Sequence, residues 1–131
     1  MSDDGALNVV KEGWELWVAG DLEKYLSLWA EDGVWTMAGR SQVSGEWRGR
    51  DEIAKMAGIA FEVSGGTLQA RLIELAAASE ESVLGYFHLN ASRPGASIDQ
   101  DGLQRLVVRD GKIVSLLNLF ADVAEIDAFY A

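Results

Sequence analysis

The sequence contains no cysteine and only one histidine among 131 residues. Without cysteine the chain has no disulfide, no thiolate metal site and no thiol nucleophile. The single histidine, His88, excludes a metal site built from several imidazoles. No apolar run approaches the roughly 18 residues that a membrane-spanning helix requires. The N-terminus lacks the basic-then-apolar pattern of a secretory signal. We therefore expect a cytoplasmic protein that uses no metal and no other cofactor.

Basic residues are also scarce, with 11 Lys and Arg against 21 Asp and Glu, which gives a formal net charge of −10. This balance argues against nucleic acid or an anionic membrane as the main partner. Hydrophobic residues make up 49% of the chain, and no low-complexity run interrupts it. Residues 1–131 are therefore expected to fold as one domain with a substantial core. Five tryptophans are many for this length, and large aromatic rings often line pockets.

Residues 97–122 predict a long β-hairpin. Its arms, residues 103–108 and 112–120, are rich in Leu, Val and Ile, and Asp110-Gly111 between them is a strong tight-turn signal. The second arm is apolar on both alternating faces, as in a strand that is covered on both sides. Buried polar groups need partners, and four polar residues lie in this apolar context: Gln104, Arg105, Asn118 and Asp122. A small-molecule site on the hairpin would explain them.

The remaining pattern places helices first and antiparallel strands after them. Asp3 or Asp4 is expected to cap the first helix and Asp21 the second. A glycine-containing loop is expected over residues 39–49. The expected elements are helices that end at Gly20, before Asp32 and at Gly65, strands over residues 34–37, 67–77, 82–91, 98–109 and 112–120, and a short terminal helix or tail over residues 123–131. This order predicts an α+β domain with helices on one face of a curved sheet.

Several segments, in this order and spacing, resemble the SnoaL-like branch of the nuclear-transport-factor-2-like superfamily: residues 19–22, 28–35, 45–53 and 109–113. The resemblance covers nearly the whole chain. It implies a cystatin-like α+β barrel, in which a conical, mixed or antiparallel sheet wraps around three N-terminal helices. It also implies a deep apolar pocket and often a homodimer. Relatives include polyketide cyclases, ketosteroid isomerases, epoxide hydrolases, scytalone dehydratases and plain binding domains.

The positions that carry ketosteroid isomerase chemistry in the family fall near Gly13, Met37 and Leu103 of this chain. None of these residues fits the role, so steroid isomerisation by that mechanism is not expected. The segment Phe120-Ala121-Asp122 is similar to the last-strand aspartate of epoxide hydrolases and SnoaL-type cyclases, with one residue extra. Asp122 is accordingly a candidate base through a bulge.

His88 is the candidate acid or base with an ordinary pKa near neutral pH. Strand alternation groups it with Leu84, Tyr86 and Asn90 on one face, and the resemblance turns this face toward the pocket. The alternative is a histidine that is hydrogen-bonded on the outer face of the sheet.

Three further candidates also have two interpretations. Asp122 is either a base with a raised pKa or the N-cap of a terminal helix. Arg105 either faces inward with Asp101 and orients a substrate oxygen, or faces outward with Gln104 turned in, and the second is favoured because a buried arginine needs a partner. Asn118 is either a donor to a developing oxyanion or a satisfied structural amide.

The predicted catalytic residues are thus His88, Asp122, Arg105 and Asn118. The predicted substrate-binding residues are Trp17, Trp35, Met37, Trp47, Tyr86, Asp101, Leu103, Leu116 and Phe120.

The predicted function is acid–base cyclisation, isomerisation or hydration of a hydrophobic, polyketide-like molecule. Epoxide opening, dehydration and non-catalytic binding remain alternatives. Leu117 and Leu119 face away from the pocket side of their strand, which predicts a homodimer across the outer sheet face.

Overall fold

The structure is a computed structural model that describes residues 5–131, so the expected cap at Asp3 or Asp4 lies outside the described residues. The elements in chain order are α1 (Gly5–Ala19), α2 (Leu22–Ser27), β1 (Trp29–Met37), β2 (Gly45–Arg48), α3 (Arg50–Val63), β3 (Gln69–Ala77), β4 (Ser82–Arg93), β5 (Ala96–Arg109), β6 (Lys112–Phe120) and α4 (Val123–Phe129). None of the described helices is long and apolar enough to cross a membrane.

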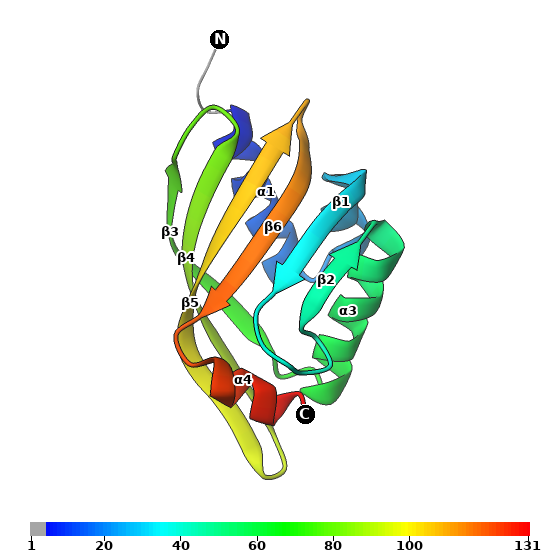
Figure 1. Ribbon diagram of the computed structural model, residues 1–131, viewed down its shortest axis with the longest axis vertical. Helices are drawn as coiled ribbons and strands as arrows, with labels where there is room; N and C mark the ends of the chain where they lie inside the picture. Colours follow the sequence, from blue (N-terminus) through cyan, green and yellow to red (C-terminus); the bar gives the residue numbers. More distant parts are fainter. Residues whose placement is uncertain (1–4) are drawn as a thin grey trace.

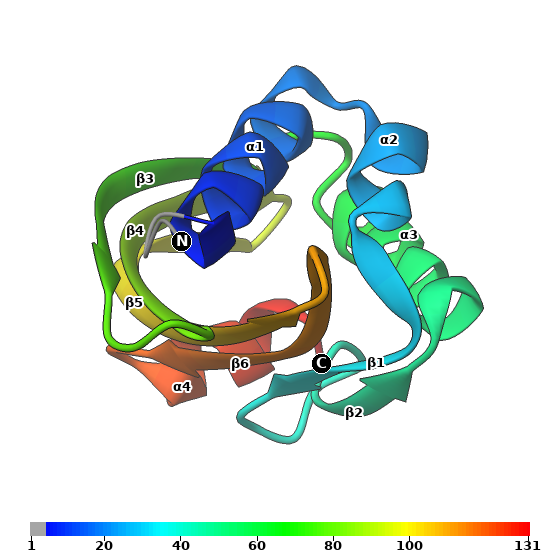
Figure 2. The same ribbon diagram turned by 90° about the horizontal axis from the view of Figure 1, so that it is seen from above.

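The strands form one six-stranded sheet in the order β2-β1-β6-β5-β4-β3 (Figure 1). All neighbours are antiparallel except β1 and β6, which are parallel. Figure 2 shows the sheet curling around α1, with α3 beside β1 and β2. This arrangement confirms the predicted α+β fold, with a curved, mixed sheet around the N-terminal helices. The edge strands β2 and β3 do not pair with each other, so the sheet is open.

Two predicted boundaries near the N-terminal half are wrong. The second helix ends at Ser27, and Trp29 already begins β1. Arg50, at the start of α3, donates from Nε to the Trp29 carbonyl over 2.9 Å. The expected loop over residues 39–49 contains β2, which pairs with β1 so that Trp47 lies opposite Trp35. Both errors have one cause, because these segments are shaped by partners distant in the chain rather than by local propensity.

Glycine makes room for the large rings of the core at two inward strand positions. The Trp29 and Trp35 rings stack 5.8 Å apart at 6°, and a Cβ at Gly33 would lie 2.6 Å from the Trp29 ring. On β5, a Cβ at Gly102 would lie 2.5 Å from Phe87 Cζ and 3.0 Å from the Leu119 carbonyl oxygen. Phe87 therefore packs into the concave side only because Gly102, its register partner, has no side chain.

Gly102→Ala is expected to destabilise the protein by about 1–3 kcal/mol through overpacking. The new methyl group meets backbone as well as the Phe87 ring, so side-chain movement alone does not relieve the contact. Urea denaturation of both forms measures the difference. Gly58→Ala is the control, because Gly58 lies in α3 and a Cβ there would have no neighbour within 4 Å, and alanine at this position should stabilise by about 0.5–1 kcal/mol. Equal effects of the two substitutions would contradict the packing role of Gly102.

Candidate functional site

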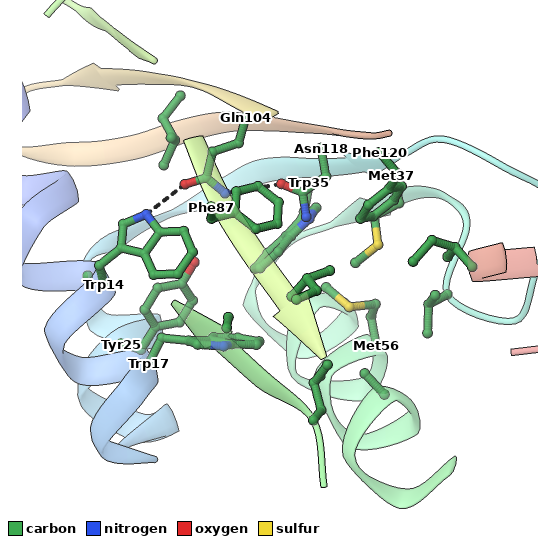
Figure 3. A pocket seen from close by; sticks show the side chains of 18 of the residues that line it. Trp14, Trp17, Tyr25, Trp35, Met37, Met56, Phe87, Gln104, Asn118 and Phe120 are labelled. Carbon is green, nitrogen blue, oxygen red and sulfur yellow. Dashed lines mark hydrogen bonds between the residues drawn. The ribbon is translucent and has the colours of Figure 1, made fainter. Parts of the chain in front are cut away.

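A cavity of about 90 Å³ lies between the concave face of the sheet and the helices. Figure 3 shows indole, phenol and phenyl rings around it, together with the thioethers of Met37 and Met56. A water molecule needs roughly 10–15 Å³ of such volume, so the space holds several waters or a compact organic molecule. The principal wall residues are Val10, Trp14, Trp17, Tyr25, Trp35, Met37, Met56, Phe87, Leu89, Gln104, Asn118, Phe120 and Tyr130.

The predicted inward orientation of Tyr86 and His88 is wrong. Phe87 and Leu89 line the cavity, and Tyr86 and His88 alternate with them on β4, so they lie on the outer face. Strand alternation separated Tyr86 and His88 correctly from Phe87 and Leu89. The error was to expect the more polar pair, and not the apolar pair, to face the pocket. Burial of the more apolar set is the favourable choice, because it removes more apolar surface from water.

A hydrogen-bonded chain of three side chains crosses the cavity wall. The indole Nε1 of Trp14 on α1 donates to Gln104 Oε1 on β5 over 2.8 Å. Gln104 Nε2 donates to Asn118 Oδ1 on β6 over 3.1 Å (Figure 3). A Cβ at Gly85, the register partner of Gln104 on β4, would lie 3.1 Å from Gln104 Cγ. Glycine at this position leaves room for the Gln104 amide to reach both Trp14 and Asn118.

The described cavity wall carries no carboxylate, imidazole, amine or guanidinium group. Its ionisable groups are the hydroxyls of Tyr25 and Tyr130. Burial raises the pKa of Tyr25 above its ordinary value and raises the pKa of Tyr130 to about 12. Both phenols are therefore protonated at neutral pH and act as hydrogen-bond donors rather than bases. Tyr130 uses its hydroxyl on the Ala60 carbonyl.

His88 belongs to a cluster on the outer face of the sheet. Its Nδ1 lies 2.7 Å from Asp101 Oδ1 and its Nε2 lies 2.6 Å from Asp99 Oδ1, both on β5. The Tyr86 hydroxyl donates to the other oxygen of Asp101. Hydrogen bonds to Asp101 and Asp99 raise the pKa of His88, and those from Tyr86 and His88 lower the pKa of Asp101. The two ring nitrogens point to different carboxylates, and no metal-binding group of His, Asp and Glu occurs among residues 5–131.

Asp122 is the N-cap of α4, the second of its two interpretations. Its carboxylate accepts from the Glu125 backbone N–H over 3.2 Å, and the residue is exposed. Its backbone N–H and C=O both bond to the side-chain amide of Gln100. Asp122 thus caps the start of α4 instead of turning its carboxylate into the cavity.

Arg105 faces outward and Gln104 inward, as favoured from the sequence. Arg105 Nη2 lies 3.3 Å from Ser82 Oγ. Asp101 bonds to His88 and Tyr86 rather than to Arg105, and Leu103 is exposed on the same outer face. These three predicted site residues are therefore outside the cavity.

The other predicted residues form two groups, those outside the cavity wall and those that line it. Leu116 is buried in the core and does not line the cavity. Trp47 is half-buried and donates to the Val43 carbonyl, also outside the wall. The residues that the structure brings together at the cavity, as predicted, are Trp17, Trp35, Met37, Asn118 and Phe120.

The predicted site residues did not include Trp14, Tyr25, Phe87 or Gln104, although Gln104 was expected to turn inward. Gln104 had a signal, since it is a polar residue in an apolar strand. Trp14 and Tyr25 had none, because a tryptophan or tyrosine on the apolar face of a helix is typical of any core.

Comparison with known proteins supports the fold. A family model described as a SnoaL-like domain matches residues 10–116. "Uncharacterized protein Rv0034" of Mycobacterium tuberculosis is 28% identical over 131 residues, 100% of both chains. Bal32a, from a soil-derived mobile gene cassette, is similar with a TM-score of 0.92 and 24% identity over 98% of each chain.

A protein of unknown function with a cystatin-like fold from Xanthomonas campestris has a TM-score of 0.90 and 29% identity, over 96% of this chain and 98% of that one. These similarities confirm the predicted superfamily and cystatin-like fold. They support a domain of small-molecule-binding or cyclase/isomerase type. The choice between binding and catalysis depends on the chemistry of the cavity wall.

The outer cluster should make stability depend on pH. The raised pKa of His88 adds stability that is complete below the unfolded value near ~6.5 and is lost as pH rises through the folded value. The lowered pKa of Asp101 adds stability that is present above about 3.9 and is lost as pH falls through its folded value. The cluster therefore stabilises most between about pH 4 and 6.5.

Urea denaturation from pH 5 to 9 measures this dependence in wild type and His88→Gln. His88 is the only histidine, and Arg71, its register partner on β3, is the facing cation. The free energy of unfolding should decline above about pH 6.5 in wild type and change less in the variant. Parallel curves for the two proteins would exclude a stabilising charge on His88.

Proposed function

This chain belongs to the SnoaL-like domain family, and we propose that it binds a compact, neutral, largely apolar small molecule in the cavity between sheet and helices. The observation that carries the proposal is the cavity wall. It is built from aromatic and aliphatic side chains, has one polar chain from Trp14 to Asn118, and includes no charged group among the described residues. Such walls, apolar with a few placed polar groups, are typical of ligand sites.

Binding is favoured over acid–base catalysis because cyclisation, isomerisation and hydration need a proton-transferring group within hydrogen-bond reach of the substrate. His88 and Arg105 lie on the outer face, and Asp122 caps α4. The phenols of Tyr25 and Tyr130 have raised pKa values and do not serve as bases at neutral pH. The same argument applies to epoxide opening and dehydration.

The size of the cavity limits its ligand. Sites for drug-sized ligands are roughly 300–1,000 Å³, whereas this cavity measures about 90 Å³. A ligand with one ring fits this proposal better than a polyketide with several, which would require wall side chains to move.

The proposal predicts that isopropylbenzene binds saturably and raises Tm in proportion to the logarithm of its concentration above Kd. Ala70→Leu should abolish the shift, because Ala70 lines the cavity. Ala76→Leu is the matched control on the same strand, since Ala76 borders the outer face instead. Calorimetry with all three proteins measures binding. Absence of binding to wild type, or equal loss in both variants, would contradict the proposal.

We also propose that a second copy of this chain covers the outer sheet face. Leu84, Leu103, Leu117 and Leu119 are exposed there and border a groove of about 350 Å³. The groove is flanked by Arg105 and Glu74. In a two-fold symmetric contact each copy brings the same surface, which allows the arginine of one copy to pair with the glutamate of the other. Exposed apolar patches of this kind are typical of interaction sites.

Leu103→Glu should dissociate this dimer, because it places a charge in the centre of the apolar face, where Leu103 is 55% exposed. Val18→Glu is the control, since Val18 is 64% exposed on α1 and the added charge is identical. Light scattering at micromolar protein should give a dimer for wild type and control and a monomer for Leu103→Glu. A monomeric wild type would refute the interface.

A further inference from the structure

The hydrogen bonds across the cavity wall run in one direction, and Trp14 sets that direction. An indole N–H only donates, so the Gln104 atom 2.8 Å from it must be the amide oxygen. The NH₂ group of Gln104 then points the other way and donates to Asn118, which must present its own oxygen. The remaining group of Asn118 is therefore its NH₂. A residue on α1 thus orients an amide that it does not touch.

The NH₂ group of Asn118 has no acceptor in the part of the chain that the structure describes. The residue lines the cavity and is only 7% exposed. Trp35, on the neighbouring strand, has a fully buried indole N–H without an acceptor among the described residues, and this N–H is a separate case from the Asn118 amide, whose residue lines the cavity. In contrast, the oxygens of Gln104 and Asn118 each accept a hydrogen bond already. A donor without a partner is costly in an apolar cavity, and within this hydrogen-bonded chain the group left without a partner is a donor, the NH₂ of Asn118.

Gln100 shows that a buried amide on this strand does not by itself indicate a ligand. It lies on the same face of β5 as Gln104 and is also buried. Its NH₂ group donates to the Asp122 carbonyl and to Glu125, and its oxygen accepts from the Asp122 N–H. Both ends are used within the protein. The Asn118 amide differs because its chain of partners ends at the cavity.

We infer that the ligand is a neutral molecule that presents a hydrogen-bond acceptor, such as a ketone, ester or quinone oxygen, to the NH₂ group of Asn118, and that Trp14 selects this chemistry by fixing both amides. The inference rests on the proposed binding function and names its ligand class. An anion does not fit, because no cationic side chain lines the described wall and burial of an unpaired charge is costly. A ligand that only donates leaves the Asn118 NH₂ unpaired.

Three aromatic probe molecules of similar size, which differ in their hydrogen-bonding groups, test this ligand class by calorimetry. Acetophenone only accepts a hydrogen bond, isopropylbenzene does neither, and indole only donates. Because the probes differ in their own hydration, the measured quantity is the Kd ratio of isopropylbenzene to acetophenone, compared between protein variants. Asn118→Leu should lower this ratio roughly 5- to 150-fold, the effect of leaving a buried hydrogen-bonding group unpaired.

Trp14→Phe tests the remote role. Without the indole N–H, Gln104 is free to turn its oxygen toward Asn118, which then turns its own oxygen to the cavity. The acetophenone preference should fall and indole should bind more tightly than to wild type. Trp47→Phe is the matched control, because it also removes a bonded indole N–H but lies outside the cavity wall. Its Kd ratio should equal that of wild type. Trp14→Phe decides the question by itself if Asn118→Leu does not fold.

The outcomes separate the inference from the function on which it rests. Binding of isopropylbenzene with an unchanged ratio in Asn118→Leu would overturn the ligand class and leave the binding function standing. A ratio unchanged in Trp14→Phe would overturn the selection by Trp14. No binding of any probe to wild type would overturn the binding function itself.

Discussion

The whole structure depends on burying apolar surface in the concave side of one curved sheet. Every inward strand position must present a side chain that fills this space or a glycine that yields to one. This constraint turns Phe87 and Leu89 inward and leaves Tyr86 and His88 on the outer face. It also explains Gly33 and Gly102, which give way to the rings of Trp29 and Phe87. Large, rigid aromatic rings that enter a concave space from three directions do not fill it completely. The cavity is the part of this space that they leave unfilled.

The polar chain in the cavity follows from the same geometry. An amide on a buried strand must find partners, and Gln104 finds one on α1 and one on β6. The chain ties the N-terminal helix to the centre of the sheet, which stabilises the wall and orients Asn118. Under the proposed ligand class, structure and recognition share one set of hydrogen bonds, and a change in the helix alters what the strand offers to a ligand.

The two faces of the sheet have different chemistry. Among residues 5–131 the cavity wall on the concave face includes no Asp, Glu, His, Lys or Arg, whereas the outer face carries the only histidine between two aspartates. A change of pH near neutrality therefore acts on the outer face, beside the exposed leucines. The inner site is shielded from it by the thickness of the sheet. The proposed ligand site inside and the proposed association surface outside are in this way subject to separate conditions.

The superfamily, the elements with strong local signals and the polar anomalies were predictable from the sequence. Asp110-Gly111 closes the last hairpin with positive φ at both residues, 51° and 75°, as its composition indicates. Asn118 was recognisable because it interrupts an apolar strand. Packing between distant elements sets which face of β4 is buried, makes Asp122 the cap of a helix, pairs residues 45–48 with β1, and brings Trp14 to Gln104 across 90 residues. Alternation divides a strand into two faces without choosing between them, and the choice depends on surface contributed by every other element.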